Sequence, residues 1–286
     1  MNTGKKVIYT CITGNYDQPL KYEYMDRDYC YVCFVDDVSQ FSNPLWEFRP
    51  LQFDELDNTR NARWHKLHPD ILFPEIDESI WIDGNINITS PEFFTKMKPL
   101  GQGEAMRVAR HPERNNLDAE YDANRGLSKD DRALLDLEQE EIHRRGFDGI
   151  YYGDRFFETN VMLRRHHLQQ CVDAMSEWWW WVDHYSFRDQ LSFTYVLWKH
   201  GLDVGYLFED NLRECSFVRF ESPRHMSLSA MDWLIDVQRR GIRDRDAEIR
   251  LLKSMLKDVN QSWSFKAGRA ITAPLRLGRD LLGHRQ

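Results

Sequence analysis

A carboxylate, a glycine and an amide follow an apolar run in the first third of the chain. The run Ser-Ile-Trp-Ile leads into Asp83-Gly-Asn85, a pattern that predicts a buried strand with a polar end. Ligands of open α/β sheets collect at the carboxyl ends of strands. A carboxylate with an amide oxygen two residues later suits a hard divalent cation that also holds diphosphate oxygens. A plain turn is the alternative, because glycine and asparagine both tolerate positive φ.

Two more predicted strands end in groups that could meet a ligand. The first, near residues 6–13, leads into Gly14, which allows close backbone approach, and Tyr16, which offers a flat face for a base. The second, residues 29–35, ends at Asp36. We therefore expect one shared pocket, although a surface turn would also explain the loop after the first strand.

A predicted helix from Asp57 to the residue before Pro69 places three cations close to one face. Arg60, Arg63 and Lys66 follow one another at intervals of three residues. Such a face could bind a diphosphate, with an arginine as a fork and a lysine as a point charge. A charged, solvated helix face is the alternative.

Asp189 and Gln190 lie at the start of a predicted helix over residues 186–201. The pattern Ser186-x-x-Asp189 resembles a capping box, so Asp189 could serve the helix terminus alone. Four consecutive tryptophans, residues 178–181, point all round the preceding predicted helix, residues 168–182. At least one of them must face solvent or a ligand such as a sugar ring, while core packing is expected for the others.

Composition describes an ordinary globular protein and excludes several classes. The net charge of −8 argues against a general nucleic-acid binder. Five scattered cysteines, an odd number, argue against a disulfide framework, and no run of about 18 apolar residues would span a membrane. The amino terminus has no apolar stretch of signal-peptide length, so we expect a cytoplasmic protein.

The remaining pattern predicts an α/β domain over residues 1–226 and a helical extension over residues 227–286. Further strands are expected at residues 104–109, 157–163 and, as the last, 203–208, with a charged surface helix over residues 128–145. In the tail, residues 264–286, basic and apolar residues are interleaved around Pro274. Such a segment could lie on an anionic membrane surface, at the inner face of the membrane, or pack on its own domain or a second subunit.

Four stretches together resemble a glycosyltransferase-like family that was first catalogued as a domain of unknown function and includes plant Golgi proteins of cell-wall and mucilage synthesis. They are residues 9–17, 63–69, 79–85 and 188–192, and residues 107–114 match a further block. The resemblance covers about residues 5–222. It implies a GT-A fold: a mixed central sheet flanked by helices, with a metal motif at the end of a central strand.

The resemblance also implies roles for individual residues. Asp189 and Gln190 would face the transferred sugar or the acceptor, and a divalent metal, Mn²⁺ or Mg²⁺, would bind Asp83, Asn85 and His225. Asp83-Gly-Asn85 departs from the usual Asp-x-Asp, because an amide brings no charge. The nucleotide-sugar would contact nine residues: Thr13, Gly14, Tyr16, Asp17, Asp36, Arg63, Lys66, Asn85 and His111.

The function predicted from these residues is transfer of a sugar from a nucleotide-diphosphate donor to a glycan acceptor. Metal, arginine and lysine would neutralise the leaving diphosphate, and a carboxylate would stabilise the sugar cation. Two alternatives remain: a glycoside hydrolase that uses Asp83 and Asp189 as its carboxylate pair, and a carbohydrate-binding module that uses the tryptophans.

Overall fold

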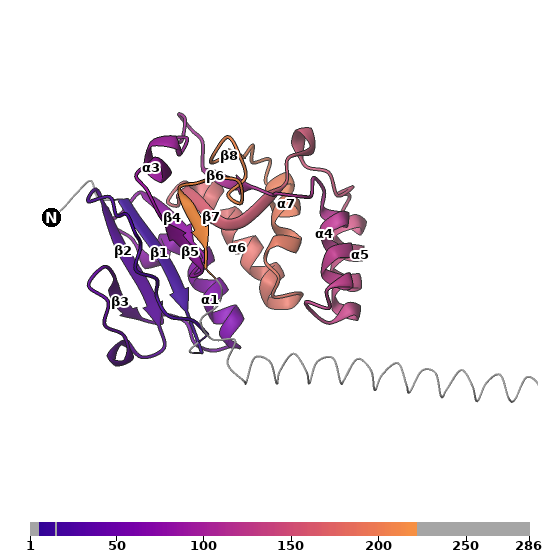
Figure 1. Cartoon of the computed structure of the whole chain (residues 1–286). Coiled ribbons are helices and arrows are strands. Elements are labelled where there is room, and N and C mark those ends of the chain that lie inside the picture. The colour runs from indigo at the N-terminus through magenta and orange to yellow at the C-terminus, as the bar shows by residue number, and fades with distance from the viewer. Residues whose placement is uncertain (1–5, 15, 222–286) are drawn as a thin grey trace, which may run out of the picture. The chain divides into compact units, whose positions relative to one another are not determined.

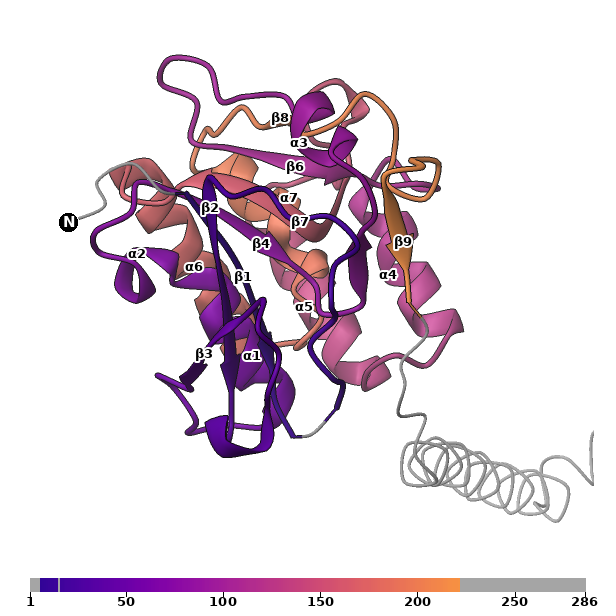
Figure 2. The same ribbon diagram turned by 60° about the vertical axis from the view of Figure 1, so that its left-hand side comes forward.

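A mixed seven-stranded sheet forms the centre of the molecule (Figures 1 and 2). The computed structural model describes residues 6–14 and 16–221. The strand order is β3-β2-β1-β4-β7-β6-β8. The strands are β1 (Lys6–Ile12), β2 (Tyr29–Val35), β3 (Glu47–Pro50), β4 (Glu78–Ile82), β6 (Met106–Arg110), β7 (Phe157–Arg165) and β8 (Gly205–Tyr206).

One antiparallel strand decides which residues meet at the functional edge of this sheet. Strands β1, β2, β3 and β4 are parallel, whereas β7 runs antiparallel between β4 and β6. The amino end of β7 therefore lies beside the carboxyl ends of β1, β4 and β6. The pairing of β7 with β6 shifts register between Val108 and Ala109, an irregularity that often accompanies active sites.

Helices cover one face of the sheet, and a two-stranded ribbon with loops covers the other (Figures 1 and 2). The helical face has α1 (Asn58–Leu67), α6 (Gln169–His184) and α7 (Gln190–Lys199), and α4 (Leu117–Gly126) and α5 (Arg132–Arg144) pack beyond α7. The other face has β5 (Ile86–Ile88), β9 (Val218–Phe220) and α3 (Glu92–Lys96). Short helices α2 (Pro69–Leu72), η1 (Val38–Gln40) and η2 (Tyr152–Asp154) complete the described elements.

Both ends of α1 are fixed by side chains, and this fixes the cations that it carries. Asp57 caps the amino end by accepting bonds from the amides of Thr59 and Arg60. At the other end the carbonyl of Lys66 accepts bonds from the Tyr9 hydroxyl (3.0 Å) and from Arg164 (2.7 Å), which is fully buried. A cation at this end also suits the helix dipole.

The sequence predicted most of this architecture. The mixed sheet flanked by helices and the Asp57 cap are confirmed. The prediction that the strand near residues 203–208 is the last is wrong, because β9 follows it. Residues 222–286, with the predicted helical extension, His225 and the basic tail, lie outside the described residues. No helix among the described residues combines the length and apolar character needed to cross a bilayer.

The four tryptophans of α6 divide as their helical positions require. Trp178 and Trp181 are fully buried, and Trp179 packs partly buried against the same core. Trp180 is the exposed member, and its ring stacks on His184 at 4.5 Å. The run therefore serves the core mainly, as the packing interpretation expected.

A buried histidine on α1 predicts a pH dependence of stability. The His65 Nδ1 lies 2.7 Å from the carbonyl of Asn61, and Nε2 accepts a bond from the Gln52 amide, so the ring is neutral. Burial lowers the pKa of His65 to about 4. Because the unfolded chain takes up this proton first, the stability is present above the unfolded pKa of about 6.5 and is lost as the pH falls towards 4.

We expect His65→Gln to flatten the decrease in unfolding free energy between pH 6.5 and pH 4, which one such group makes as large as about 3 kcal/mol. Urea unfolding at several pH values measures it. His184→Gln, at an exposed position, is the control and should leave the slope unchanged. An equal pH slope in His65→Gln and the parent chain would contradict the assignment.

Candidate active site

The ends of β1 and β2 are joined directly by a glycine and a carboxylate. The amide of Gly14 donates to Asp36 Oδ2 at 2.6 Å, and Thr13 Oγ1 donates to the Asn58 carbonyl at 2.7 Å. Gly14 has φ +64°, and a Cβ there would lie 2.1 Å from the side chain of Asn58, so only glycine fits. Tyr16 is 69% exposed beside this junction and offers its ring to solvent.

At the end of β4, the turn after Asp83 presents one carboxylate oxygen to the edge. The amide of Asp83 donates to the Asn160 carbonyl on β7, and the amide of Ile86 donates back to the Asp83 carbonyl. Trp81 Nε1 donates to Asp83 Oδ1 at 2.7 Å. This bond fixes the carboxylate orientation and leaves Oδ2 without a partner among the hydrogen bonds and ion pairs of the described residues.

The donor atoms here suit a metal that is shared with a substrate. Asp83 Oδ2 and the amide oxygen of Asn85 are hard donors, as Mg²⁺ and Mn²⁺ prefer. Within residues 6–14 and 16–221, no three histidine, cysteine or acidic side chains gather as a metal site. The residues therefore fit a cation whose other ligands come from a diphosphate, whereas they do not form an all-protein cage.

A buried ion cluster lies beneath this edge, between α1, β7 and the start of α7. Lys66 Nζ donates to Asp189 Oδ2 and pairs with it, and it also donates to Thr159 Oγ1 at 3.0 Å. The Thr159 hydroxyl donates a hydrogen bond to the same carboxylate oxygen at 3.1 Å. The other oxygen, Oδ1, lies 3.1 Å from Arg63 Nε. Both oxygens of Asp189 are thus held by cations or a hydroxyl.

Electrostatics keep this cluster ionised. Burial alone would raise the pKa of Asp189, but the charges of Arg63 and Lys66 outweigh burial and hold the pKa well below its usual range. Burial would lower the pKa of Arg63, but the carboxylates of Asp189 and Asp83 reverse the effect and raise it. The charge of Arg63 is therefore stabilised by two carboxylates, one buried and one half-buried.

The start of α7 and the cations of α1 differ from the predictions made from the sequence. The capping box at the start of α7 is wrong, because the Asp189 side chain makes no cap hydrogen bond and points into the ion cluster. Arg60, Arg63 and Lys66 do not present one face to a ligand. Lys66 is buried with 1% of its side chain exposed, which argues against direct contact with a diphosphate, while Arg63 keeps 18% exposure.

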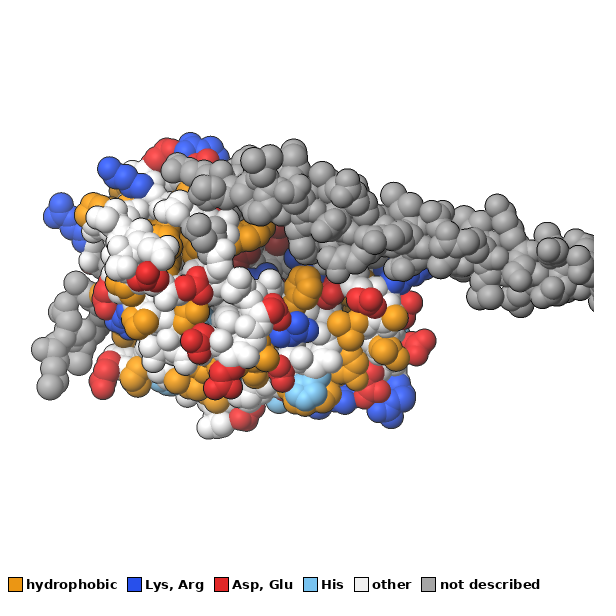
Figure 3. Space-filling view, turned by 90° about the horizontal axis from the view of Figure 1, so that it is seen from below, with side chains coloured by type: hydrophobic (Ala, Val, Ile, Leu, Met, Phe, Trp, Pro, Cys, Tyr) orange, Lys and Arg blue, Asp and Glu red, His pale blue; other side chains and the backbone are white. Residues whose placement is uncertain are grey.

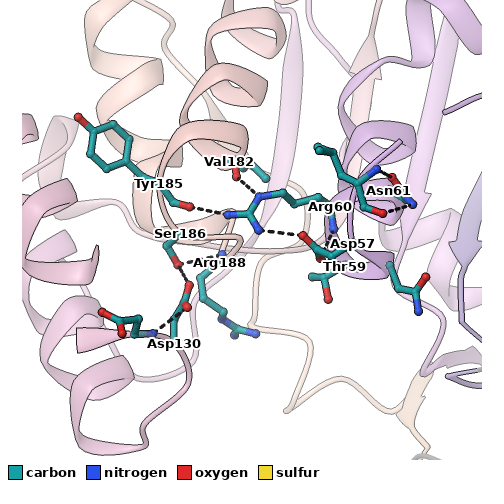
Figure 4. A network of polar contacts seen from close by, with 12 residues as sticks. Asp57, Thr59, Arg60, Asn61, Asp130, Val182, Tyr185, Ser186 and Arg188 are labelled. Carbon is teal, nitrogen blue, oxygen red and sulfur yellow. Dashed lines mark hydrogen bonds and ion pairs between the residues drawn. The ribbon is translucent and has the colours of Figure 1, made fainter. Parts of the chain in front are cut away.

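Arg60, the third of these cations, instead joins α1 to the end of α6 (Figure 4). It donates to the Val182 carbonyl at 2.9 Å and to the Tyr185 carbonyl at 2.7 Å, two acceptors at the last turn of α6. It also pairs with Asp57, the cap of its own helix. These bonds hold the segment that leads to Asp189 against α1.

Other predicted site residues have mixed placements. Asp17 is buried and accepts a bond from the following amide, and no described contact joins it to Asp83. His111 is buried at the end of β6, where Nδ1 accepts bonds from the amides of Glu113 and Arg114. These bonds stabilise the His111 loop, and its contact with a donor stays a prediction. Gln190, half-buried, makes no side-chain bond among the described residues.

Sequence reasoning missed the residues at the amino end of β7. Thr159 completes the ion cluster, and Asn160 is buried with both side-chain atoms lacking a hydrogen-bond partner within the described structure. An amide with an unused donor and acceptor suits sugar hydroxyl groups. The signal in the sequence is a polar Thr-Asn pair near the start of a largely apolar strand, whereas the carboxyl ends of strands are the usual place for ligands.

A separate cavity of about 520 Å³ lies between the loops that follow β1 and η1. Its lining includes Leu20, Phe41 and Asn87 but none of the predicted site residues. Figure 3 faces the edge at which β1 and β2 end, and acidic and basic side chains are interspersed across it. We therefore define the site by its convergent polar side chains and not by this cavity.

Comparisons with known proteins agree on one class. A family model described as TOD1/MUCI70, glycosyltransferase-like domain matches residues 49–221. The probable hexosyltransferase MUCI70 of Arabidopsis thaliana is 27% identical over 150 residues, which are 49% of this chain and 25% of that protein. The chain thus matches about a quarter of the length of that relative.

The backbone is distantly similar to that of two solved structures. The apo structure of the bifunctional glycosyltransferase WbbM has a TM-score of 0.41 and 12% identity, over 72% of this chain and 39% of that one. Mouse xyloside xylosyltransferase 1, also without ligand, has a TM-score of 0.39 and 12% identity, over 71% of this chain and 84% of that one.

The buried cluster predicts that Asp189 carries stability as well as any chemistry. We expect Asp189→Asn to lower the unfolding free energy by about 3–5 kcal/mol, because it leaves the buried Lys66 ammonium without its anion. A double variant with Lys66→Met should recover most of this loss, since it removes the orphaned charge. Denaturant unfolding measures both, and equal stability of Asp189→Asn and the parent chain would refute the buried pair.

Proposed function

The chain belongs to the TOD1/MUCI70 glycosyltransferase-like domain family, and from this premise we propose that it transfers a hexose from a nucleotide-diphosphate donor to a glycan acceptor. The hexose is proposed because the matched relative is a probable hexosyltransferase. One observation supports the proposal most: Arg63 lies 3.1 Å from the buried carboxylate of Asp189, and the charge of the half-buried Asp83 also raises its pKa.

Each part of this edge supports one step of the proposed transfer. The backbone at Gly14, held against Asp36, leaves room for close approach of the nucleoside, and the exposed Tyr16 ring can stack on its base. Asp83 and Asn85 would hold a divalent cation, which supplies Lewis-acid stabilisation of the leaving diphosphate. The Arg63 guanidinium, fixed by Asp189, adds a second positive charge without reorganisation.

The sugar would then lie towards the start of α7 and the amino end of β7. The half-buried Gln190 has side-chain donors and an acceptor that no described residue uses, so it is suited to bind sugar hydroxyl groups. Asp189 lies buried in the ion cluster as a fixed negative charge. In this proposal it is a positioning residue for Arg63 more than a nucleophile, because both its oxygens are engaged.

The glycoside hydrolase alternative gains no support from these contacts. A hydrolase needs one carboxylic acid that is protonated near neutral pH, usually because its surroundings raise the pKa. Asp189 has the opposite property, since Arg63 and Lys66 hold its pKa below the usual range. The tryptophans offer the binding-module alternative one exposed ring, that of Trp180, which already stacks on His184.

A donor screen tests the proposal. The full chain is incubated with a panel of nucleotide-hexoses, with Mn²⁺ or with a chelator, and release of nucleoside diphosphate is measured. We expect release from one donor, loss of release with the chelator, and recovery on adding Mn²⁺, because the proposed metal neutralises the leaving group. Turnover that is indifferent to the chelator would remove the metal from the proposal, and no release from any donor would refute the transfer.

Asp83→Asn separates charge from structure at the end of β4. Asparagine keeps an acceptor for Trp81 Nε1 but removes the negative charge, so the fold should persist while donor turnover falls by about 100-fold or more. Asp54→Asn, at an exposed carboxylate outside the site, is the matched control. A well-folded Asp83→Asn protein with the parent rate would show that this carboxylate does not serve the reaction.

A further inference from the structure

Two cations beside the candidate active site have no anionic partner. Among the described residues, the side chains of Arg188 and Lys129 make no hydrogen bond or ion pair, and Figure 4 draws the Arg188 guanidinium without a contact. Four neighbouring cations are paired: Arg63 and Lys66 with Asp189, Arg114 with Glu120, and Arg213 with Glu158. Arg188 and Lys129 differ from these four in having no such partner among the described residues.

One buried hydroxyl joins the backbone of Arg188 to Asp130, the residue that follows Lys129 (Figure 4). Ser186 Oγ, with no exposure, accepts a bond from the Arg188 amide at 3.1 Å and donates to Asp130 Oδ2 at 2.5 Å. Lys129 directly precedes Asp130 in the loop between α4 and α5. The bond thus joins segments about 56 residues apart in sequence, and each segment carries a cation within two residues of it.

The pKa shifts of both side chains indicate positions at which a bound anion would be favourable. Burial lowers the pKa of Arg188, and the charge of Arg63 lowers it further, although Asp189, Glu120 and Asp83 act in the opposite direction. For Lys129, burial again lowers the pKa first, and Arg188 is the strongest of the charges that act with it. Like charges of this kind, one half-buried and one exposed, are stabilised by a bound anion.

The two cations lie near residues to which the proposed function gives the sugar. The nucleoside side, at the ends of β1 and β2, has the acidic pair Asp36 and Asp37. The charge of Lys129 instead helps to lower the pKa of His111, the residue that directly follows β6, and Arg188 directly precedes Asp189.

We propose that Arg188 and Lys129 bind an anionic substituent, a carboxylate or a phosphate, on one of the two sugars that the transfer joins. Arginine supplies a planar fork that matches carboxylate or phosphate oxygens, and lysine supplies a point charge. The identification of the ligand as a sugar rests on the proposed function. The presence of an anion site depends only on the two unpaired cations and the bond that joins their segments.

Direct measurement of ligand binding to the full chain tests the anion site without requiring catalytic turnover. The probes are glucuronate, glucose 6-phosphate, glucose and pyrophosphate, titrated by calorimetry or by NMR at low and high salt. We expect one of the acidic sugars to bind at least about 10-fold more tightly than glucose, with affinity that decreases as salt rises. Arg188→Gln and Lys129→Gln should each lower that affinity by about 10-fold.

The control is Arg27→Gln, an exposed arginine that precedes β2 at the opposite edge of the sheet and should change nothing. Lys129→Gln is at an exposed position, so it remains informative if Arg188→Gln fails to fold. An equal loss of pyrophosphate and acidic-sugar binding would assign the pair to the donor diphosphate and overturn the proposal. Unchanged acidic-sugar affinity in both variants would overturn it too.

Competition identifies which sugar carries the anion. A neutral nucleotide-hexose from the donor screen is added at saturation before glucuronate or glucose 6-phosphate. If the anion belongs to the transferred sugar, the neutral donor occupies its place and blocks the acidic probe. If it belongs to the acceptor, the probe binds beside the donor. A failed donor screen would refute the transfer and leave the anion site to be judged by the binding data alone.

Discussion

The arrangement of the whole edge depends on one buried ion pair, between Lys66 on α1 and Asp189 at the start of α7. Removing two charges from water is costly, and the pair is tolerated because Thr159 and Arg63 complete its contacts. An apolar pair of similar volume would be about as stable. The ion pair gives instead a carboxylate that stays ionised inside the protein and an arginine held beside Asp83.

The rest of the helical layer supports that pair. The carbonyl of Lys66 is held by Tyr9 and Arg164, so α1 is fixed to β1 and β7 at the level of its last turn. Arg60 ties its first turn to α6. With both ends fixed, the cations of α1 have fixed positions relative to the ends of the strands, which is what electrostatic preorganisation requires.

The sequence predicted the parts of this site that depend on local pattern. Asp83, Gly14 and Asp36 follow apolar strands, and such strand ends are visible in one sequence because burial and turn chemistry act over a few residues. Contacts between distant elements were not predictable in the same way. The Ser186-x-x-Asp189 pattern satisfied the rule for a cap, but pairing with α1, 123 residues earlier, decided where the carboxylate points.

Strand direction was the second reason for incomplete prediction. A search at the carboxyl ends of parallel strands finds Asp83 and Asp36, but β7 is antiparallel and brings its amino end, with Thr159 and Asn160, to the same edge. Nothing in the local pattern of residues 157–165 specifies that direction. The direction is seen only in the folded sheet, where β7 lies between β4 and β6 and pairs antiparallel with both.

The short segment at the start of α7 alternates buried side chains, which anchor it, with half-buried side chains, which are free to bind a ligand. Ser186 and Asp189 are buried anchors, whereas Arg188 and Gln190 are half-buried and make no side-chain bonds within the described residues. The anchors fix the backbone from which the two free side chains project. A loss of activity on changing Asp189 would therefore not by itself assign chemistry to that carboxylate, because it would also displace Arg188 and Gln190. Only substitutions of the free side chains, made with both anchors intact, separate binding from support.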